Sequence, residues 1–578
     1  MCGTGTAPAP HTGAVALLPG TPEVHPTPDG WLAFTDADAS DRVDLPSGTV
    51  TGLLTRSVRG RTADVGADAL GTALDKGFDA AGEFLAGLLP PFAAVHRGPT
   101  GPVVLVGDWL GLRQLYWWQG DGVAAVSTSA LALGRLAGAG LDTAALGVQS
   151  LVGWQLGEAT VLRGVRKLAP GCAAVLRSGT VTVHRYVDAD LTADTGPDVV
   201  DELATILRDI HAAYLADHPD TVLQLTGGQD SRILLCAVPP DARRGMRALT
   251  LDGGQGRDVP VARRLAALCG LDHRVHRMDE LPPVPPKAAY QLAVDASLAL
   301  DAMASPLALA PLLHVESTLE QGHRLSGAGG ETARGFYYPG QPHGAVTEPR
   351  LVHRLADWRL FANEAVDTEA LEPDFVAAAR TAALDAAEEE FSGYSREWLR
   401  ATDEFYLWQR TQRWAGAHGT VAAVQRHFVN PLLDRRVMQL ALAPSPADKR
   451  DSRLTGRLIT RLDARLAAVP LDSGLIPARL GAHGLATKVA VARVTAGKAA
   501  AKLRQRVAGA RKAQLGAAEL SGLVVAHWRA EPGVVAPLAR TGLVRPQWMD
   551  ELLAGRREAP PTTVAFLVNL LVAADATG

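Results

Sequence analysis

The spacing of hydrophobic and polar positions changes once along this chain, near residue 190. Before that point, apolar runs of strand length alternate with Gly, Pro and Asp, a pattern typical of β-structure. The clearest predicted strands are Val103–Val106, Ala124–Ser127, Ala173–Leu176 and Thr180–Val183. We therefore expect a β-rich first domain over residues 1–190 and a second domain over residues 199–578. The polar segment between them contains Gly196-Pro197 and is predicted to be a linker.

From residue 199 onward, helices and strands are predicted to alternate. The predicted elements are the helix Val199–Leu215, the strand Thr221–Leu225, the helix Ser231–Val238, the strand Met246–Leu251, the helix Asp258–Cys269 and the strand His273–Met278. This order is typical of an α/β fold with a parallel, doubly wound sheet. Beyond about residue 350 the chain is predicted to continue as a helical extension.

Composition sets limits on location and partners. The formal net charge is −4, so nothing in it indicates nucleic acid or an anionic membrane as a partner. The longest apolar stretch, Val564–Ala574, is too short to span a bilayer and contains Asn569. Four scattered cysteines without a CxxC pair suit a reducing compartment, and no secretory signal is apparent. We expect a cytoplasmic protein without membrane insertion.

The most informative segment is a glycine loop between a strand and a helix. It is Leu223–Arg232, with the sequence LQLTGGQDSR. Glycines allow the backbone to approach a phosphate, and the start of a helix offers free N–H groups. A carboxylate at Asp230 would be favourable there only with a bridging Mg²⁺. Because no lysine follows the glycines, the loop is not that of the usual nucleotide triphosphatases.

TGGQDS resembles the SGGxDS pyrophosphate loop of the asparagine synthetase superfamily, the N-type ATP pyrophosphatases. Other segments resemble this family in the same order. They are Gly107–Tyr116, Thr160–Gly171, Leu249–Leu251 with Gly256–Val259, Ser326–Glu331 and Asn430–Asp434. The resemblance covers nearly the whole chain. It implies an N-terminal Ntn-hydrolase-like glutaminase β-sandwich and a C-terminal ATP-pyrophosphatase domain.

The resemblance also implies roles for individual residues, with ATP and Mg²⁺ as cofactors. Asp230 and Glu331 would bind Mg²⁺, and Asp230 and Ser231 would serve catalysis. Leu225 and Leu251 would supply backbone contacts to adenosine, and Gly227, Gly228 and Ser231 would hold the pyrophosphate. The residues implied in ATP binding are thus Leu225, Thr226, Gly227, Gly228, Ser231, Leu251, Ser326 and Gly327.

Three departures from the family pattern bear on the reaction. Cys2 could be a glutaminase nucleophile, but the family's glutamine-binding segments are not found between Gly13 and Leu89, so Cys2 is interpreted as a relic. Ala328 stands where asparagine-forming members have a glutamate and β-lactam-forming members a tyrosine. No lysine stands at the family's catalytic position, and Lys449 or Arg453 could supply the positive charge instead. For each, a solvated loop charge is an equally good interpretation.

Within the superfamily the pattern most resembles lasso peptide cyclases, which are AMP-forming amide ligases. They join a peptide's N-terminal amine to an Asp or Glu side chain as a macrolactam (isopeptide bond). A precursor peptide would be the substrate, and a leader peptidase and a leader-binding protein possible partners. Another natural-product amide ligase, a β-lactam-type synthetase, a glutamine-hydrolysing asparagine synthetase and a catalytically dead scaffold remain alternatives. Trp408 and Trp414 could line a peptide groove, although core packing is the default for such aromatic residues.

Overall fold

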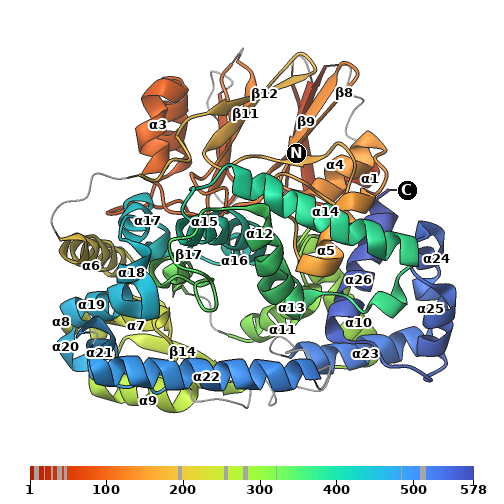
Figure 1. The fold of residues 1–578 in the computed structure, drawn as a ribbon. Helices are drawn as coiled ribbons and strands as arrows, with labels where there is room; N and C mark the ends of the chain where they lie inside the picture. The colour runs from red at the N-terminus through yellow and green to blue at the C-terminus, as the bar shows by residue number, and fades with distance from the viewer. Residues whose placement is uncertain are drawn as a thin grey trace.

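A computed structural model of the chain describes residues 1–5, 12–18, 20–27, 30–35, 42–44, 49–99, 101–192, 198–252, 258–277, 284–319, 322–482, 484–507 and 516–577. In these residues the strands form three sheets, of which two are antiparallel and one is parallel. Many helices pack around them, so the protein has a mixed α/β structure. Figure 1 shows the antiparallel strands at one end and the last helices along one side.

The first antiparallel sheet places the first strand of the chain in its interior. Its strands, in spatial order, are β10 (Arg166–Lys167), β8 (Tyr116–Gly120), β9 (Val123–Ser127), β1 (Cys2–Gly5), β3 (Gly30–Thr35) and β2 (Pro22–Thr27). The second sheet has the order β12 (Thr180–Arg185), β11 (Cys172–Arg177), β7 (Val103–Gly107), β6 (Ala93–Arg97), β5 (Val50–Leu53) and β4 (Arg42–Asp44). The four strands predicted in this region are confirmed as β7, β9, β11 and β12.

The pleat of β7 explains why its sequence is apolar throughout. Val103 and Leu105 join a cluster that also holds Leu32 and Phe34 of the first sheet, so the two sheets face each other. The alternate residues Val104 and Val106 pack with helices α2 (Ala67–Leu74) and α3 (Phe78–Ala86) on the opposite face. Because successive side chains point to opposite faces, a strand covered on both sides needs an unbroken hydrophobic run.

The parallel sheet reverses its strand order in the middle. Its strands are β15 (Asp272–Arg277), β14 (Arg247–Asp252), β13 (Val222–Gln224), β16 (Arg324–Leu325) and β17 (Phe428–Val429), in that spatial order. The chain therefore builds outward from β13 in one direction, returns, and continues with β16 on its other side. In open α/β sheets the crevice at the carboxyl ends of such neighbouring strands is the usual place for a ligand.

The helices next to this sheet match the sequence predictions closely. Those packed around it are α6 (Val199–Asp217), α7 (Asp230–Ala237), α8 (Pro240–Arg243), α9 (Asp258–Cys269), α17 (Arg435–Leu442), α18 (Pro446–Lys449), α19 (Arg453–Leu462), α20 (Ala464–Ala467) and α21 (Pro477–Ala482). The predicted parallel sheet and the helices 199–215, 231–238 and 258–269 are thus confirmed within one or two residues. Gly256, Arg257 and the linker pair Gly196-Pro197 lie outside the described residues.

The remaining helices complete the fold. They are α1 (Thr12–Val15), α4 (Ala130–Ala137), α5 (Thr143–Val152), α10 (Pro286–Ala299), α11 (Pro306–Ser317), α12 (Pro349–Leu355), α13 (Phe361–Glu364), α14 (Pro373–Ser392), α15 (Trp398–Phe405), α16 (Gly416–Gln425), α22 (Leu485–Val507), α23 (Ala517–Ala530), α24 (Pro537–Thr541), α25 (Pro546–Leu553) and α26 (Pro561–Ala576). A π-helix, Tyr406–Ala415, joins α15 to α16. The mostly helical chain expected beyond residue 350 is confirmed, and α10 and α11 precede it.

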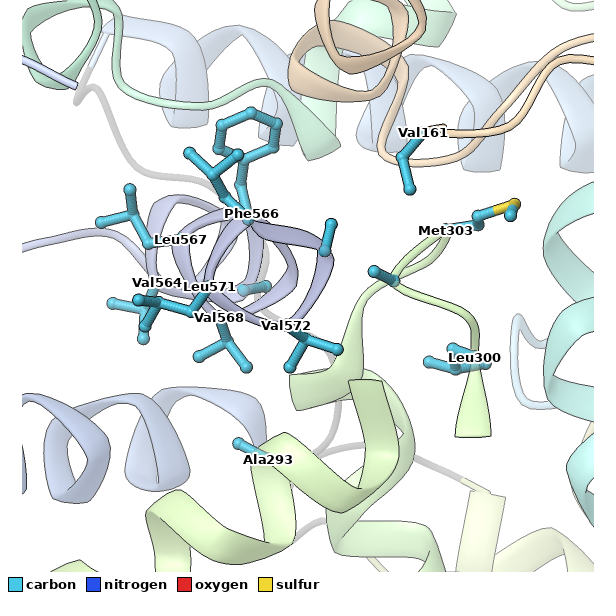
Figure 2. Close-up of a cluster of buried hydrophobic side chains, with 14 of the residues drawn as sticks. Val161, Ala293, Leu300, Met303, Val564, Phe566, Leu567, Val568, Leu571 and Val572 are labelled. Carbon is cyan, nitrogen blue, oxygen red and sulfur yellow. The ribbon is translucent and has the colours of Figure 1, made fainter. Parts of the chain in front are cut away.

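Helix α26 contains the longest apolar stretch and is buried on all sides. In Figure 2 its side chains project in every direction, among them Val564, Phe566 and Val572, and Ala293 of α10 lies beside it. Asn569, the polar residue within the apolar stretch Val564–Ala574, accepts a hydrogen bond from Ser297 Oγ (2.7 Å) and donates one to the Ala304 carbonyl (2.8 Å). Among the helices described, none has both the length and the apolarity needed to cross a membrane.

Candidate functional site

The first glycine loop lies at the carboxyl end of β13, as the sequence predicts, and is held by its own hydrogen bonds. Ser231 Oγ accepts from the Thr226 N–H (3.1 Å) and lies 3.0 Å from Thr226 Oγ1. The Gly228 N–H donates to Thr226 Oγ1 (3.1 Å), and the Gly227 N–H donates to Asp258 Oδ1 (2.9 Å). Both glycine amides expected to hold pyrophosphate therefore have internal partners here, which a bound anion would have to displace.

The second glycine loop follows β16 and packs against the first. A Cβ atom on Gly327 would lie 3.1 Å from Asp230 Cβ and 3.2 Å from the Ser231 amide nitrogen. A Cβ atom on Gly330 would overlap the Asp230 carboxylate. A larger residue at position 330 would force the loops apart, and one at position 327 would require a small shift. The two loops meet where the strand order of the parallel sheet reverses.

The contact between the loops contains two carboxylates and one guanidinium. Arg334 Nη2 donates to Asp230 Oδ2 at 2.8 Å and lies 3.1 Å from Glu331 Oε1. The side chains of Asp230, Glu331 and Arg334 are 19%, 26% and 28% exposed, so each is accessible at its edge. Burial raises the pKa of Asp230, Glu331 raises it further, and Arg334 opposes both effects.

The residues present fit a magnesium ion that also binds phosphate oxygens. Asp230 Oδ1 is buried and has no hydrogen-bond partner within the described chain, so it is available as a ligand. Mg²⁺ is usually held by one or two carboxylates together with substrate phosphates and water, which matches the pair Asp230 and Glu331. No group of three or more His, Cys, Asp or Glu side chains suited to a metal occurs in the described residues.

The residues expected to contact adenosine lie at the carboxyl ends of β13 and β14. The Leu225 N–H already donates to the Leu249 carbonyl (2.9 Å), and the Leu225 carbonyl accepts from Thr250 Oγ1 (2.7 Å). Leu225 therefore has only a carbonyl lone pair left for a nucleotide. Leu251 lies near the end of β14, and Ser326 Oγ accepts from the Ala328 N–H (3.3 Å).

Lys449 lies in a buried cluster rather than on an exposed loop. Its ammonium group pairs with Asp403 Oδ2, and both side chains are almost completely buried. The Tyr338 hydroxyl donates to the same oxygen at 2.6 Å. The interpretation of Lys449 as a solvated loop charge is therefore wrong, because burial and an ion pair fix its position.

The Lys449 segment is also tied to the first glycine loop. Gln229 Nε2 donates to Ser452 Oγ (3.0 Å), and Gln229 Oε1 accepts from Thr455 Oγ1 (2.5 Å). Sequence reasoning missed Arg334 and Asp403 as site residues, although Arg334 follows the second glycine loop directly.

Cys2 is buried in the interior of the first antiparallel sheet. It is 1% exposed in β1, between Leu32 of β3 and Val126 of β9. Burial raises the pKa of its thiol to about 12, so the thiolate needed by a nucleophile is strongly disfavoured. The other three cysteines are also free and buried.

A cavity of ≈ 900 Å³ lies away from both glycine loops. Its wall includes Lys167, Asp403, Glu404 and Trp408. Through Asp403 this cavity adjoins the Lys449 cluster. Trp414 lies elsewhere, with its ring 4.5 Å from the Arg410 guanidinium carbon, so the two tryptophans do not line one groove.

No family model matches the chain, and no curated protein is similar to it. Among solved structures, the allosteric regulatory enzyme of purine biosynthesis is similar at 11% identity and a TM-score of 0.20. The match covers 43% of this chain and 66% of that enzyme, just under two thirds of its length. A similarity at this level carries no weight for fold family or function.

Proposed function

We propose that the protein is an ATP-dependent, AMP-forming amide ligase of the asparagine synthetase type. A carboxylate oxygen of the substrate attacks the α-phosphorus of ATP, and pyrophosphate leaves. The amine then attacks the acyl carbon of the adenylate and displaces AMP. Catalysis of this kind depends mainly on positioning and on stabilisation of developing charge.

One observation carries this proposal: two glycine loops meet at the reversal point of a parallel sheet around an unpartnered carboxylate oxygen. Asp230 stands at the first turn of α7, where the helix N-terminus favours an anion, and Glu331 lies across the loop contact. A bare carboxylate is unfavourable beside an anion site, whereas a carboxylate that binds Mg²⁺ is not. When bound there, Mg²⁺ would neutralise charge on the phosphates of the nucleotide.

The amine is proposed to arrive on the substrate itself. A buried thiol with a raised pKa supports the interpretation of Cys2 as a relic, so glutamine would not supply ammonia. A peptide α-amine has a reference pKa of about 7.7–8.0, so it needs a strong base less than ammonium does, which suits alanine at position 328. We therefore propose macrolactam closure of a lasso precursor peptide in the cytoplasm, with a leader peptidase and a leader-binding protein as partners.

The fold is proposed to follow the same family. Two antiparallel sheets face each other, and helices α2 and α3 cover the outer face of one of them. This arrangement supports an Ntn-hydrolase-like sandwich for residues 1–190, and the parallel sheet supports an ATP-pyrophosphatase domain for residues 199–578.

The test compares Asp230→Asn with the wild type. Removing the charge should weaken Mg·ATP binding, measured by calorimetry, and should lower AMP release with a lasso precursor core peptide by roughly 100-fold or more. Asp209→Asn, a change of an exposed carboxylate on α6, serves as the control and should leave both unchanged. Failure of the wild type to bind Mg·ATP would overturn the whole proposal. Robust asparagine synthesis from aspartate and ammonia would overturn the proposed macrolactam closure alone.

A further inference from the structure

Two polar atoms of the Asp230–Arg334 ion pair are buried without partners in the described residues. One is an acceptor, Asp230 Oδ1, and the other is a donor, Arg334 Nε–H. The other oxygen of this carboxylate, Asp230 Oδ2, accepts a hydrogen bond from Arg334 Nη2 at 2.8 Å. Buried polar groups normally find partners, so an unsatisfied acceptor and an unsatisfied donor in one pair indicate a site that a ligand completes.

The ligand must supply opposite charges to the two atoms. A cation is the favourable partner for the carboxylate oxygen, and an anion such as a phosphate oxygen is the favourable partner for the guanidinium N–H. A magnesium diphosphate presents both at once. We propose that Arg334 binds the leaving diphosphate of ATP through its Nε–H and its Nη2 group. Mg²⁺ would take the place of the guanidinium beside Asp230 and Glu331, which frees Nη2 for the diphosphate. This inference rests on the proposed function.

The backbone around Arg334 fixes where its guanidinium lies. Arg334 ends the short 3₁₀-helix Gly330–Arg334, which stands between Gly329 (φ 96°) and Gly335 (φ 62°). A Cβ atom on Gly335 would overlap the Tyr338 ring, so this turn accepts only glycine. The turn thus holds the arginine beside Asp230 with 28% of its side chain accessible. Lysine could not replace it fully, because its ammonium group lacks the planar fork that matches a phosphate.

A purely structural role is the competing explanation. In that case Arg334 only keeps two like charges together, and its loss would damage the carboxylate pair itself. Phosphate binding makes a different prediction, because the metal and the guanidinium compete for the same carboxylates. Removing Arg334 would then weaken diphosphate binding while leaving metal binding intact or stronger.

The experiment measures the two affinities separately in the intact chain. Mn²⁺ binding without nucleotide is followed by electron paramagnetic resonance, and binding of magnesium pyrophosphate and Mg·ATP by calorimetry. Arg334→Gln should weaken diphosphate and Mg·ATP binding about tenfold or more, with Mn²⁺ affinity unchanged or higher. The affinity of Arg334→Lys for diphosphate and Mg·ATP should lie between those of the wild type and Arg334→Gln. The lysine variant replaces the glutamine variant in the experiment if the latter does not fold.

Arg359→Gln provides the matched control. Arg359 lies over the Phe336 ring at 5.2 Å and donates to the Phe336 carbonyl (3.1 Å), so it supports the same segment without contacting Asp230. Its loss should leave diphosphate affinity unchanged. Equal diphosphate binding by Arg334→Gln and wild type, or a parallel loss of Mn²⁺ binding, would overturn this inference alone. A wild type that binds neither Mg·ATP nor pyrophosphate would overturn the proposed function instead.

Discussion

At the scale of single residues, the buried pair Lys449–Asp403 gives the sharpest expectation for stability. The side chains are 0% and 2% exposed, so removing the lysine leaves a carboxylate in the interior without its cation. Lys449→Met should therefore lower the free energy of unfolding by about 3 kcal/mol, as measured by urea denaturation. Burial already raises the pKa of Asp403 against the opposing effect of Lys449, and the variant should raise it further.

The double variant Lys449→Met/Asp403→Leu separates stability from catalysis. Replacing both charges by apolar groups of similar size is often close to neutral, so most of the lost stability should return. If Lys449 supplies charge to the reacting phosphate, AMP release should stay low in the double variant. Recovery of both quantities would assign the pair a structural role only.

Residues of the site could be predicted from the sequence only where the signal is local. Asp230 and its two glycines follow a strand directly, so their chemistry is visible in ten consecutive residues. Arg334 is separated from Asp230 by 104 positions, and no local pattern indicates that they pair. The burial of Cys2 depends likewise on β3 and β9, which the sequence does not align with it.

At the scale of elements, Asp301 connects the turn after α10 to the start of α4. Its Oδ1 accepts from Ser129 Oγ (2.6 Å) and from the Leu131 N–H (3.1 Å), and burial raises its pKa to about 7. The native state then holds a proton that the unfolded chain has lost, so stability should fall as pH rises from about 4 to 7. In Asp301→Asn the side chain cannot ionise, so this loss of stability should disappear. The amide oxygen can still accept the hydrogen bonds from Ser129 and Leu131.

Urea denaturation at several pH values tests this expectation. At pH 8 the Asn variant should be more stable than wild type by about 2 kcal/mol, and near pH 4 the two should be similar. Residue 301 has φ 50°, which asparagine tolerates, so no strain is added. A variant that is less stable at pH 8 would show that Ser129 and the N-terminus of α4 keep the carboxylate ionised.

The elements themselves were predictable in proportion to their length. β7, β9, α6 and α9 have enough residues for their periodicity to appear, and the structure confirms them. β16 and β17 have two residues each and give no such pattern. Without them the strand order could not be derived, so neither could the contact between the two glycine loops.

At the scale of the whole molecule, a column of three histidine rings meets the antiparallel part through His218, whose Nε2 lies 2.8 Å from Asp64 Oδ2. His218 and His323 stack with ring centroids 3.8 Å apart, and His427 lies 4.5 Å from His323. His323 and His427 precede β16 and β17, so the column lies at the end of the parallel sheet opposite the glycine loops. The other titratable or charged groups facing it are Arg56, Arg59, Asp64, Tyr214, Asp217 and Asp220.

This column should make the contact between the two parts sensitive to acid. Burial lowers the pKa of His427, and His323 lowers it further, so the unfolded chain binds more protons than the native one below about pH 6.5. By linkage, stability rises with pH through that window and is lost as the pH falls. His427→Phe keeps a ring in the stack but cannot be charged.

Urea denaturation between pH 5 and 8 measures the difference. On unfolding, the wild type should take up roughly one proton more than His427→Phe in the acid range, which appears as a steeper fall of stability with falling pH. His184→Phe on β12, where the ring stacks on Phe78 outside the column, should keep the wild-type slope. Equal slopes for the wild type and His427→Phe would mean that the charge of His427 does not govern the contact.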